Sequence, residues 1–326
     1  MVMDVRTISF NQLPNLEKSA CCIGYFDGLH KGHQQLIKKA KQEAKDNHLL
    51  SGMITFHPDP WTLFHPEKPL THLCTLDDKM ELARSMQLDV FYILEFSKEF
   101  ASLSVDQFHQ VLKDMHIVSL VCGFDFQYGT KNSGNIQSLL SQKDFKVSVI
   151  DSVNDKEEKI SSSRIEPCIE KGDMESANEL LGYPYSISGT IGHGYRRGTN
   201  LLEIPTANLD YNEEYVLPQV GVYAGFILLD QMIYPTMINV GNNPTFGNHE
   251  LSIEAHILDF NQNIYDKPAR YFFLEKIRDE IQFDHFEQLK DQLHQDIQTS
   301  KMALSKYQKQ KEQIHSIWIK NNFQEE

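Results

Sequence analysis

Two histidines stand three residues apart in the segment Gly24–His33, where an apolar run gives way to a helical pattern. In a helix this spacing places His30 and His33 on one face of the first turn, where both imidazoles can donate to phosphate oxygens. Gly32 between them has no side chain, so a ligand can approach the backbone closely. Together with the positive end of a helix, these features predict a polyphosphate site. A capped helix start with two exposed histidines and a histidine metal pair are the alternatives.

A second group of reactive side chains lies in the other half of the chain. Thr206 and Asn208 are two residues apart, so on a strand they point the same way and both could face one Mg²⁺ ion. The alternative is an ordinary turn and strand start at Pro205. Glu254 begins an apolar strand-like run and is a candidate base for activating a hydroxyl nucleophile. Otherwise it is an exposed carboxylate at a barrel edge, the commoner place for a glutamate on a strand.

A glycine-rich stretch precedes these residues, with four glycines and two arginines between residues 189 and 198. Glycines permit tight turns, and free backbone N–H groups can cradle phosphates. We therefore expect this stretch to cover a nucleotide. Its candidate binding residues are Gly189, Gly192, His193, Gly194, Arg197 and Gly198.

The first half of the chain alternates short β-rich runs with helical patterns, which predicts βαβ units and a parallel sheet. Ligands of such sheets bind at the carboxyl ends of the strands, where the histidine segment is expected. The predicted strands are Ala20–Gly24, Gly52–Phe56, Val90–Phe96, Val118–Gly123 and Lys146–Asp151. The predicted helices are Gly32–Asn47, Asp77–Met86, Val105–Met115 and Ile136–Gln142.

The pattern changes near residue 184. Residues 185–273 carry many short strand-like runs with frequent Gly and Pro and no strong helix, which predicts an antiparallel barrel. A helix is expected over Pro167–Gly182, ending at a glycine cap, and another from His285 to about Asn321. We therefore predict two domains, residues 1–184 and 185–326.

Composition limits the class of protein. A chain of 326 residues fits two domains, and its net charge of −14 disfavours non-specific nucleic-acid binding. Five cysteines without C-x-x-C spacing are typical of reduced thiols and imply no zinc site. We find no apolar run of membrane-spanning length and no signal-peptide pattern, so we expect a cytoplasmic protein. Assembly into a homo-oligomer is left open.

The ordered motifs resemble those of the bacterial bifunctional riboflavin kinase/FAD synthetase family. The resemblance is carried by Gly24–His33, Thr55–Phe56, Gly123–Phe126, Ile160–Ser163 and Pro205–Leu209, and continues through Gly221–Tyr223, Asn239–Gly247 and Glu254–Phe260. It covers essentially the whole chain. It implies a nucleotidyltransferase-type Rossmann-like domain followed by a riboflavin kinase domain, a six-stranded antiparallel barrel with a C-terminal helix.

The resemblance also implies roles. The first domain would join the AMP of ATP to FMN to form FAD, with His30 and His33 stabilising charge on the phosphates. The second would phosphorylate riboflavin to FMN with ATP and Mg²⁺, using Thr206 and Asn208 as metal ligands and Glu254 as base. The further binding positions it implies are Gly24, Phe26, Asp27, Gly28, Gly32, Ser161, Ser162, Ser163, Arg164, Pro205, Ala207, Tyr223 and Arg278.

Two departures from the family pattern concern the first domain. Glu166 stands where the serine motif usually carries a basic residue, while Arg164 lies two residues earlier. Asp59 stands where the family usually has a histidine. A lost charge-assisted hydrogen bond costs about 1.5–3 kcal/mol, and an added carboxylate repels phosphates. We therefore hypothesise that adenylyl transfer is weakened or lost.

The alternative from another class is a flavin-binding regulator, or an RNA-binding protein, derived from the enzyme. The retained Glu254 favours the enzyme, because a sensor needs no base. A basic cluster in the first half, Lys38, Lys39, Lys41 and Lys45, could form a patch for RNA, although such clusters are more often a solvated helix face.

Overall fold

The computed structural model describes the chain except for residues 1, 68–69, 193–204, 243–250 and 320–326. It divides into two compact units, Met1–Ser161 and Ser162–Glu326. The helices that follow residue 161 therefore belong with the barrel. The predicted division of the two activities at residue 184 stays a prediction.

The first unit is built on a six-stranded parallel sheet with the order β1-β4-β3-β2-β5-β6, as the α/β pattern predicted. All five residues of β2 are buried, which is typical of a strand covered on both faces. The edge strand β1 was not predicted, because only one of its five residues is fully buried. The strands are β1 (Asp4–Ile8), β2 (Ser19–Ile23), β3 (Leu50–His57), β4 (Val90–Glu95), β5 (Ile117–Gly123) and β6 (Lys146–Ile150).

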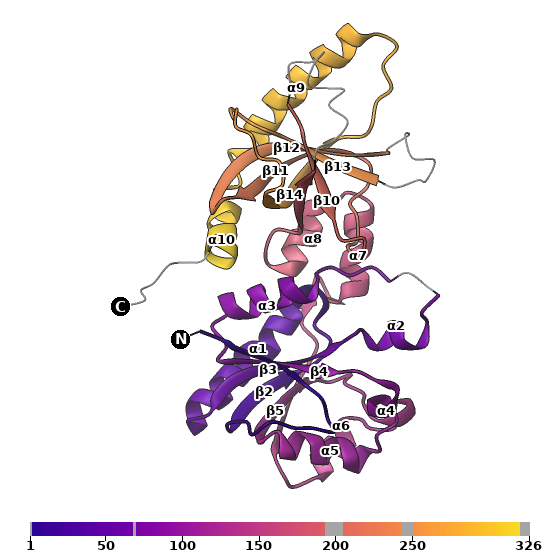
Figure 1. Ribbon diagram of the computed structural model, residues 1–326, viewed down its shortest axis with the longest axis vertical. Coiled ribbons are helices and arrows are strands. Elements are labelled where there is room, and N and C mark those ends of the chain that lie inside the picture. Colours follow the sequence, from indigo (N-terminus) through magenta and orange to yellow (C-terminus); the bar gives the residue numbers. More distant parts are fainter. Residues whose placement is uncertain (1, 68–69, 193–204, 243–250, 320–326) are drawn as a thin grey trace. The chain divides into compact units, whose positions relative to one another are not determined.

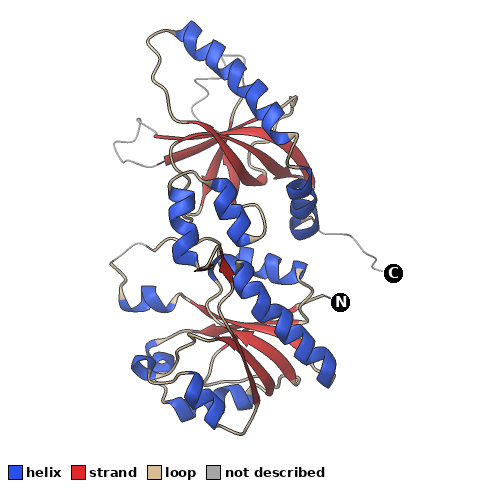
Figure 2. Ribbon diagram, turned by 180° about the vertical axis from the view of Figure 1, so that it is seen from behind, coloured by secondary structure: helices blue, strands red, loops and turns tan. Residues whose placement is uncertain are grey.

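Helices cover both faces of this sheet, with α1 and α3 on one side and α5 and α6 on the other (Figures 1 and 2). Capping boxes begin α3, α5 and α6, at Thr75, Ser104 and Asn135. The elements are η1 (Asp27–Leu29), α1 (Lys31–Asn47), α2 (Pro60–Phe64), α3 (Leu76–Ser85), α4 (Lys98–Ala101), α5 (Val105–Asp114), η2 (Thr130–Asn132) and α6 (Ile136–Ser141), with a hairpin of β7 (Asn154–Asp155) and β8 (Glu158–Lys159).

The strand order reverses beside β2. From β2 the chain proceeds to β3 and β4 on one side, whereas β5 and β6 lie on the other. Such a reversal leaves a crevice at the carboxyl ends of the two central strands, the usual ligand site of open α/β sheets. The segment Gly24–His33 leaves β2 at this edge, and Phe124 leaves β5 there.

The second unit contains a closed antiparallel barrel with the order β10-β13-β12-β11-β14-β9, which confirms the predicted fold class. Tyr271 and Phe273 lie on one face of β14, whereas Phe272 points the opposite way, toward Trp318 of the C-terminal helix, and all three are 0% exposed. The strands are β9 (Ser186–Gly192), β10 (Ala207–Tyr211), β11 (Gly221–Leu229), β12 (Met232–Asn242), β13 (Leu251–Ile257) and β14 (Pro268–Arg278).

In the described part of the second unit, four helices accompany the barrel where two were expected. The segment predicted as one helix over Pro167–Gly182 forms α7 (Ser162–Glu170) and α8 (Met174–Leu181). Gly172, at φ 77°, ends the first, and Asp173 caps the second. The glycine cap is confirmed, since Gly182 is left-handed at φ 84°.

The C-terminal helix is also divided, into α9 (Phe286–Leu304) and α10 (Gln308–Trp318). The N–H groups of Ser305, Lys306 and Tyr307 each bond to a carbonyl three residues back. This tighter turn interrupts the α-helical hydrogen bonds without a glycine or proline. The sequence therefore contains no helix-breaking residue that would predict the end of α9.

Candidate active sites

The turn after β2 is held in shape by the segment that leads into α3. Phe26 is left-handed at φ 60°, and Gly28 has φ 69°, where glycine carries no steric penalty. The Leu73 N–H donates to Asp27 Oδ1 at 2.9 Å, and the Gly28 N–H donates to Cys74 Sγ at 3.0 Å. These bonds fix the loop from which α1 begins.

His30 and His33 lie together at the start of α1. Their rings stack with centroids 3.7 Å apart and planes 18° apart. His30 is the N-cap, and its Nδ1 accepts a hydrogen bond from the His33 N–H at 3.4 Å. The neutral His30 ring therefore carries its proton on Nε2, which remains available as a donor. The alternative interpretation, a capped helix start with exposed histidines, is therefore correct about the cap. It is wrong about the exposure of His30, which is only 5% exposed.

Burial governs the protonation of both histidines. It lowers the pKa of His30 to about 4, assisted by the charge of Lys159. The pKa of His33 is lowered well below its ordinary value by burial, then by His30, Lys79 and Lys159. Within the described residues, His33 Nδ1 is buried without a hydrogen-bond partner. Both rings are therefore neutral at rest, and their predicted bonds to phosphates stay a prediction.

Two glycines permit this packing. A Cβ on Gly32 would lie 3.0 Å from the His30 ring and 3.7 Å from the Ile160 carbonyl oxygen, so the strand leading to the serine motif passes beside the histidine turn. A Cβ on Gly24 would lie 3.3 Å from the Phe26 ring. Ser161 ends the first compact unit, and the other predicted members of the motif, Ser162, Ser163 and Arg164, open α7 of the second.

Asp59 and Glu166, the two departures from the family pattern, have distinct surroundings. Asp59 caps α2, since its Oδ1 accepts from the Trp61 N–H at 2.5 Å. Glu166 is half-buried in α7, and its pKa is raised by burial and by Glu170. Arg164 projects about 200° away around the helix axis, so it does not replace the missing positive charge at position 166.

In the barrel, the predicted catalytic residues come together. Asn208 on β10 is paired in register with Glu254 on β13, so the two side chains leave the same face of the sheet. Burial raises the pKa of Glu254, and the nearby Thr206 hydroxyl partly offsets the rise. A carboxyl group with a raised pKa is suited to act as a base near neutral pH.

A fourth polar residue joins this group. Asn239 on β12 is paired in register with the other side of Glu254, so it lies on the same face. The sequence interpretation included Asn239 only as part of a longer motif. Asn239 could be assigned to this site only from the register between β12 and β13. That register is set by the strand order of the barrel and not by the local sequence pattern.

The residues around Glu254 fit a magnesium ion by their chemistry. Thr206 and Asn208 offer a hydroxyl and an amide oxygen beside the Glu254 carboxylate, and Mg²⁺ accepts oxygen ligands of these types. A cavity of about 100 Å³ lies beside them, lined in part by Pro205, Thr206 and Ala207. The His256 ring bonds to the Pro205 carbonyl at 2.9 Å and fixes the entry to β10.

The glycine-rich stretch is only partly described. Gly189 and Gly192 lie within β9 rather than in a turn, and neither has positive φ. A Cβ on Gly189 would lie 2.2 Å from the Asp210 carbonyl oxygen, and one on Gly192 would lie 2.5 Å from the Asp210 carboxylate. These two glycines therefore permit close approach of β9 and β10. The predicted residues His193, Gly194, Arg197 and Gly198 lie outside the described residues.

Two further predicted binding residues have structural partners. Tyr223 is 0% exposed in the barrel core, and its hydroxyl donates to the Gln219 carbonyl. Arg278 holds α9 through Asp296, with Nε–Oδ1 and Nη2–Oδ2 distances of 3.0 and 2.7 Å. Their predicted contacts with a nucleotide or flavin stay predictions.

Comparison with known proteins decides the family. An FAD synthetase family pattern matches residues 12–164, and a riboflavin kinase pattern matches residues 181–304. A bifunctional riboflavin kinase/FMN adenylyltransferase of Listeria monocytogenes is 37% identical over 289 residues, 87% of this chain and 92% of that protein. The chain belongs to the bifunctional riboflavin kinase/FMN adenylyltransferase family.

Further relatives agree in length and arrangement. The enzyme of the same description from Bacillus subtilis is 36% identical over 288 residues, 86% of this chain and 91% of that protein. A crystal structure described as a macrolide-efflux protein from Streptococcus pneumoniae superposes with a TM-score of 0.83 at 33% identity, covering 90% of this chain and 98% of that one. The findings support a transferase with both domains, and none favours the regulator.

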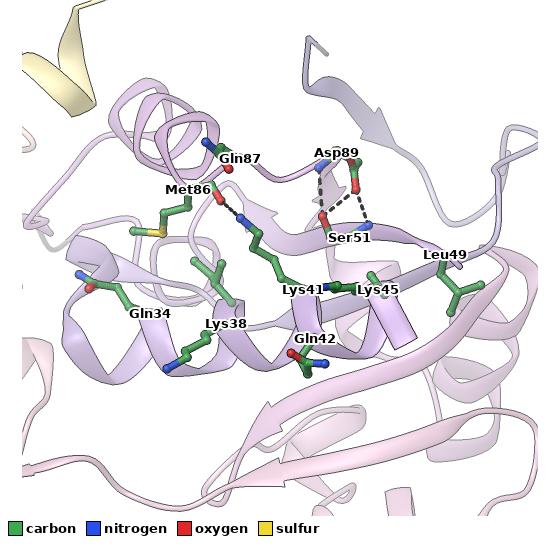
Figure 3. A pocket seen from close by; sticks show the side chains of 12 residues that line it. Gln34, Lys38, Lys41, Gln42, Lys45, Leu49, Ser51, Met86, Gln87 and Asp89 are labelled. Carbon is green, nitrogen blue, oxygen red and sulfur yellow. Dashed lines mark hydrogen bonds between the residues drawn. The ribbon is translucent and has the colours of Figure 1, made fainter. Parts of the chain in front are cut away.

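Three of the four lysines of the predicted basic cluster line a groove beside α1. Lys38, Lys41 and Lys45 line a groove of about 650 Å³ between α1 and the segment before β4 (Figure 3). Lys41 donates to the Met86 carbonyl at 2.5 Å, and Asp89 in the same groove accepts two bonds from Ser51. Of these lysines, Lys45 lies in the last turn of α1, where positive charge offsets the helix dipole. With Asp89 present, the groove is poorly suited to an anion.

Across the part of the chain that the structure describes, no helix is both long and apolar enough to cross a membrane. The same residues bring together no group of three His, Cys, Asp or Glu side chains that could hold a metal ion.

Proposed function

We propose that the barrel phosphorylates riboflavin with ATP, using Glu254 as general base and Thr206 and Asn208 as ligands of Mg²⁺. The register pairing of Asn208 with Glu254 carries this proposal, because it joins two residues far apart in sequence. The Glu254 carboxylate takes the proton of the terminal ribityl hydroxyl as that oxygen attacks the γ-phosphorus, and ADP leaves with the electrons of the broken P–O bond. When bound, Mg²⁺ neutralises charge on the phosphates.

The matching test compares two barrel carboxylates. Glu254→Gln in the full chain is expected to lower FMN formation at least about a hundredfold, the scale of a lost acid–base group. Asp230→Asn is the control, because Asp230 lies in the exposed β11–β12 turn and pairs with Lys267 at 2.5 Å. Such a surface pair contributes little to stability. Near-normal turnover in Glu254→Gln would remove it as the base, whereas equal losses in both variants would indicate a general folding defect.

We propose further that the first unit transfers AMP from ATP to FMN, and that this step is weakened in this chain. Its support is chemical. Asp59 adds a carboxylate near Tyr25 and Lys79, and Glu166 replaces a positive charge in the serine motif. Each added negative charge opposes the binding of a polyphosphate.

The proposed location is the cytoplasm. All five cysteines are free thiols, and four of them are buried. Unpaired cysteines in a folded chain are typical of proteins from a reducing compartment.

A further inference from the structure

Helix α3 carries a lysine that is almost wholly buried. Lys79 is 2% exposed, and its Nζ lies 3.5 Å from the centroid of the Tyr25 ring. Within the described residues its ammonium has no ion pair or hydrogen bond, only this ring contact. A buried ammonium without a bonded counter-charge is costly to the fold. A group kept at such a cost beside a ligand crevice is a candidate for function.

Lys79 is attached to the same turn that leads to the two histidines. Its N–H donates to the Thr75 carbonyl at 3.0 Å, in the first turn of α3. The two residues before Thr75 hold that turn through Asp27 and Gly28, and α3 packs against η1. Tyr25, beneath the ammonium, is fixed through its carbonyl, which accepts from the Thr55 hydroxyl at 3.0 Å.

Negative charges approach Lys79 from three elements. They come from Asp27 in η1, Asp59 before α2 and Asp78 in α3 itself. Burial lowers the pKa of Lys79, and Cys74 and these carboxylates oppose the fall. Of the three, Asp59 is the residue in which this chain departs from its family.

We propose that Lys79 is a positioning residue for adenylyl transfer, whose buried ammonium holds the Tyr25 ring at the end of β2 and supplies positive charge beside the histidine turn. This inference rests on the proposed adenylyl transfer. It also gives Asp59 a second effect besides capping α2, because its carboxylate offsets part of the Lys79 charge.

The charge of Lys79 acts on His33. The groups that face His33 are the stacked His30 ring, the Phe26 ring with its centroid 5.2 Å away, and the charges of Lys79 and Lys159. Lys159 is already paired with Asp125 at 2.5 Å, whereas Lys79 has no such partner among the described residues. Lys79 therefore helps to keep His33 neutral until phosphate charge arrives.

The test uses the full chain with Lys79→Met and Lys79→Arg. Methionine fills a similar volume without charge, so it should leave the first unit folded and at least as resistant to urea as the unsubstituted chain. FAD formation from FMN should nevertheless fall about tenfold, while FMN formation in the barrel is unchanged. Lys79→Arg, which keeps the charge, should restore most of the FAD formation.

A second readout does not depend on activity. The His33 imidazole, assigned by comparison with His33→Gln, should titrate at a higher pH in Lys79→Met by NMR, because the removed ammonium no longer opposes its protonation. The titration decides the proposal even if the chain forms no FAD. An unchanged His33 titration in Lys79→Met would overturn it. So would a loss of FAD formation in Lys79→Arg equal to that in Lys79→Met, because packing rather than charge would then be the cause.

Discussion

His30 is a base that the fold keeps neutral, and this has a consequence for stability. Its pKa in the folded chain is lowered from 6.5 to about 4, chiefly by burial. Between these values the unfolded chain binds a proton that the folded chain excludes, so the free energy of unfolding falls as the pH drops below about 6.5. The pKa of His33, which burial also lowers well below its ordinary value, acts in the same direction.

We therefore expect the first unit to lose about 1 kcal/mol of stability per histidine between pH 7.5 and pH 5.5, measured by urea unfolding. His30→Asn retains an N-cap side chain but cannot titrate, so its stability should depend less on pH. Unfolding that is independent of pH over this range, or an identical pH dependence in His30→Asn, would contradict the assignment of buried neutral histidines.

For single residues, the sequence predicts which side chains are reactive better than it predicts how those side chains are arranged. The spacing of His30 and His33 placed them correctly at the start of a helix. Their stacking and the capping role of His30 Nδ1 depend on backbone angles at Phe26 and Gly28 that no side-chain pattern specifies. Lys79 was not predicted at all, since nothing in a helical pattern marks one lysine as buried.

Among the elements, the pairing of β9 with β10 is the most sensitive to a small change. The Cβ of an alanine at position 189 would lie 2.2 Å from a backbone oxygen of Asp210, which cannot move aside as a side chain could. We expect Gly189→Ala to lower the stability of the barrel by about 1–3 kcal/mol, the usual cost of overpacking.

Thr190→Ala, at the adjacent exposed position on the same strand, is the control and should change stability by only a few tenths of a kcal/mol. Both variants are compared by urea unfolding of the full chain. Equal stability of Gly189→Ala and the unsubstituted protein would show that the strands separate without cost, contrary to this account.

The elements themselves were predictable where burial is regular. The alternation of buried strands and amphipathic helices gave five strands of the parallel sheet and four of its helices to within a few residues. The predictions failed where a helix breaks without proline, as at Ser305–Tyr307, and where a strand is largely exposed, as in β1. Such features are decided by tertiary contacts.

For the whole molecule, the order of motifs was enough to predict a Rossmann-like unit and a closed barrel, and both are confirmed. The pairing of Asn208 with Glu254 needed the barrel's strand order. The balance between the two activities is a property of the whole chain, because the product of one domain is the substrate of the other. In this proposal, Asp59 and Glu166 slow adenylyl transfer in the first domain and leave phosphorylation in the barrel unchanged.

The most direct test is a time course of flavins, separated by chromatography, after the full chain is mixed with riboflavin, ATP and Mg²⁺. We predict that FMN accumulates first and that FAD follows slowly, with faster FAD formation and unchanged FMN formation in Asp59→His/Glu166→Arg. FAD forming as fast as FMN in the unsubstituted chain, or no gain in the double variant, would contradict a weakened adenylyl transfer, and an absence of FMN would contradict the kinase.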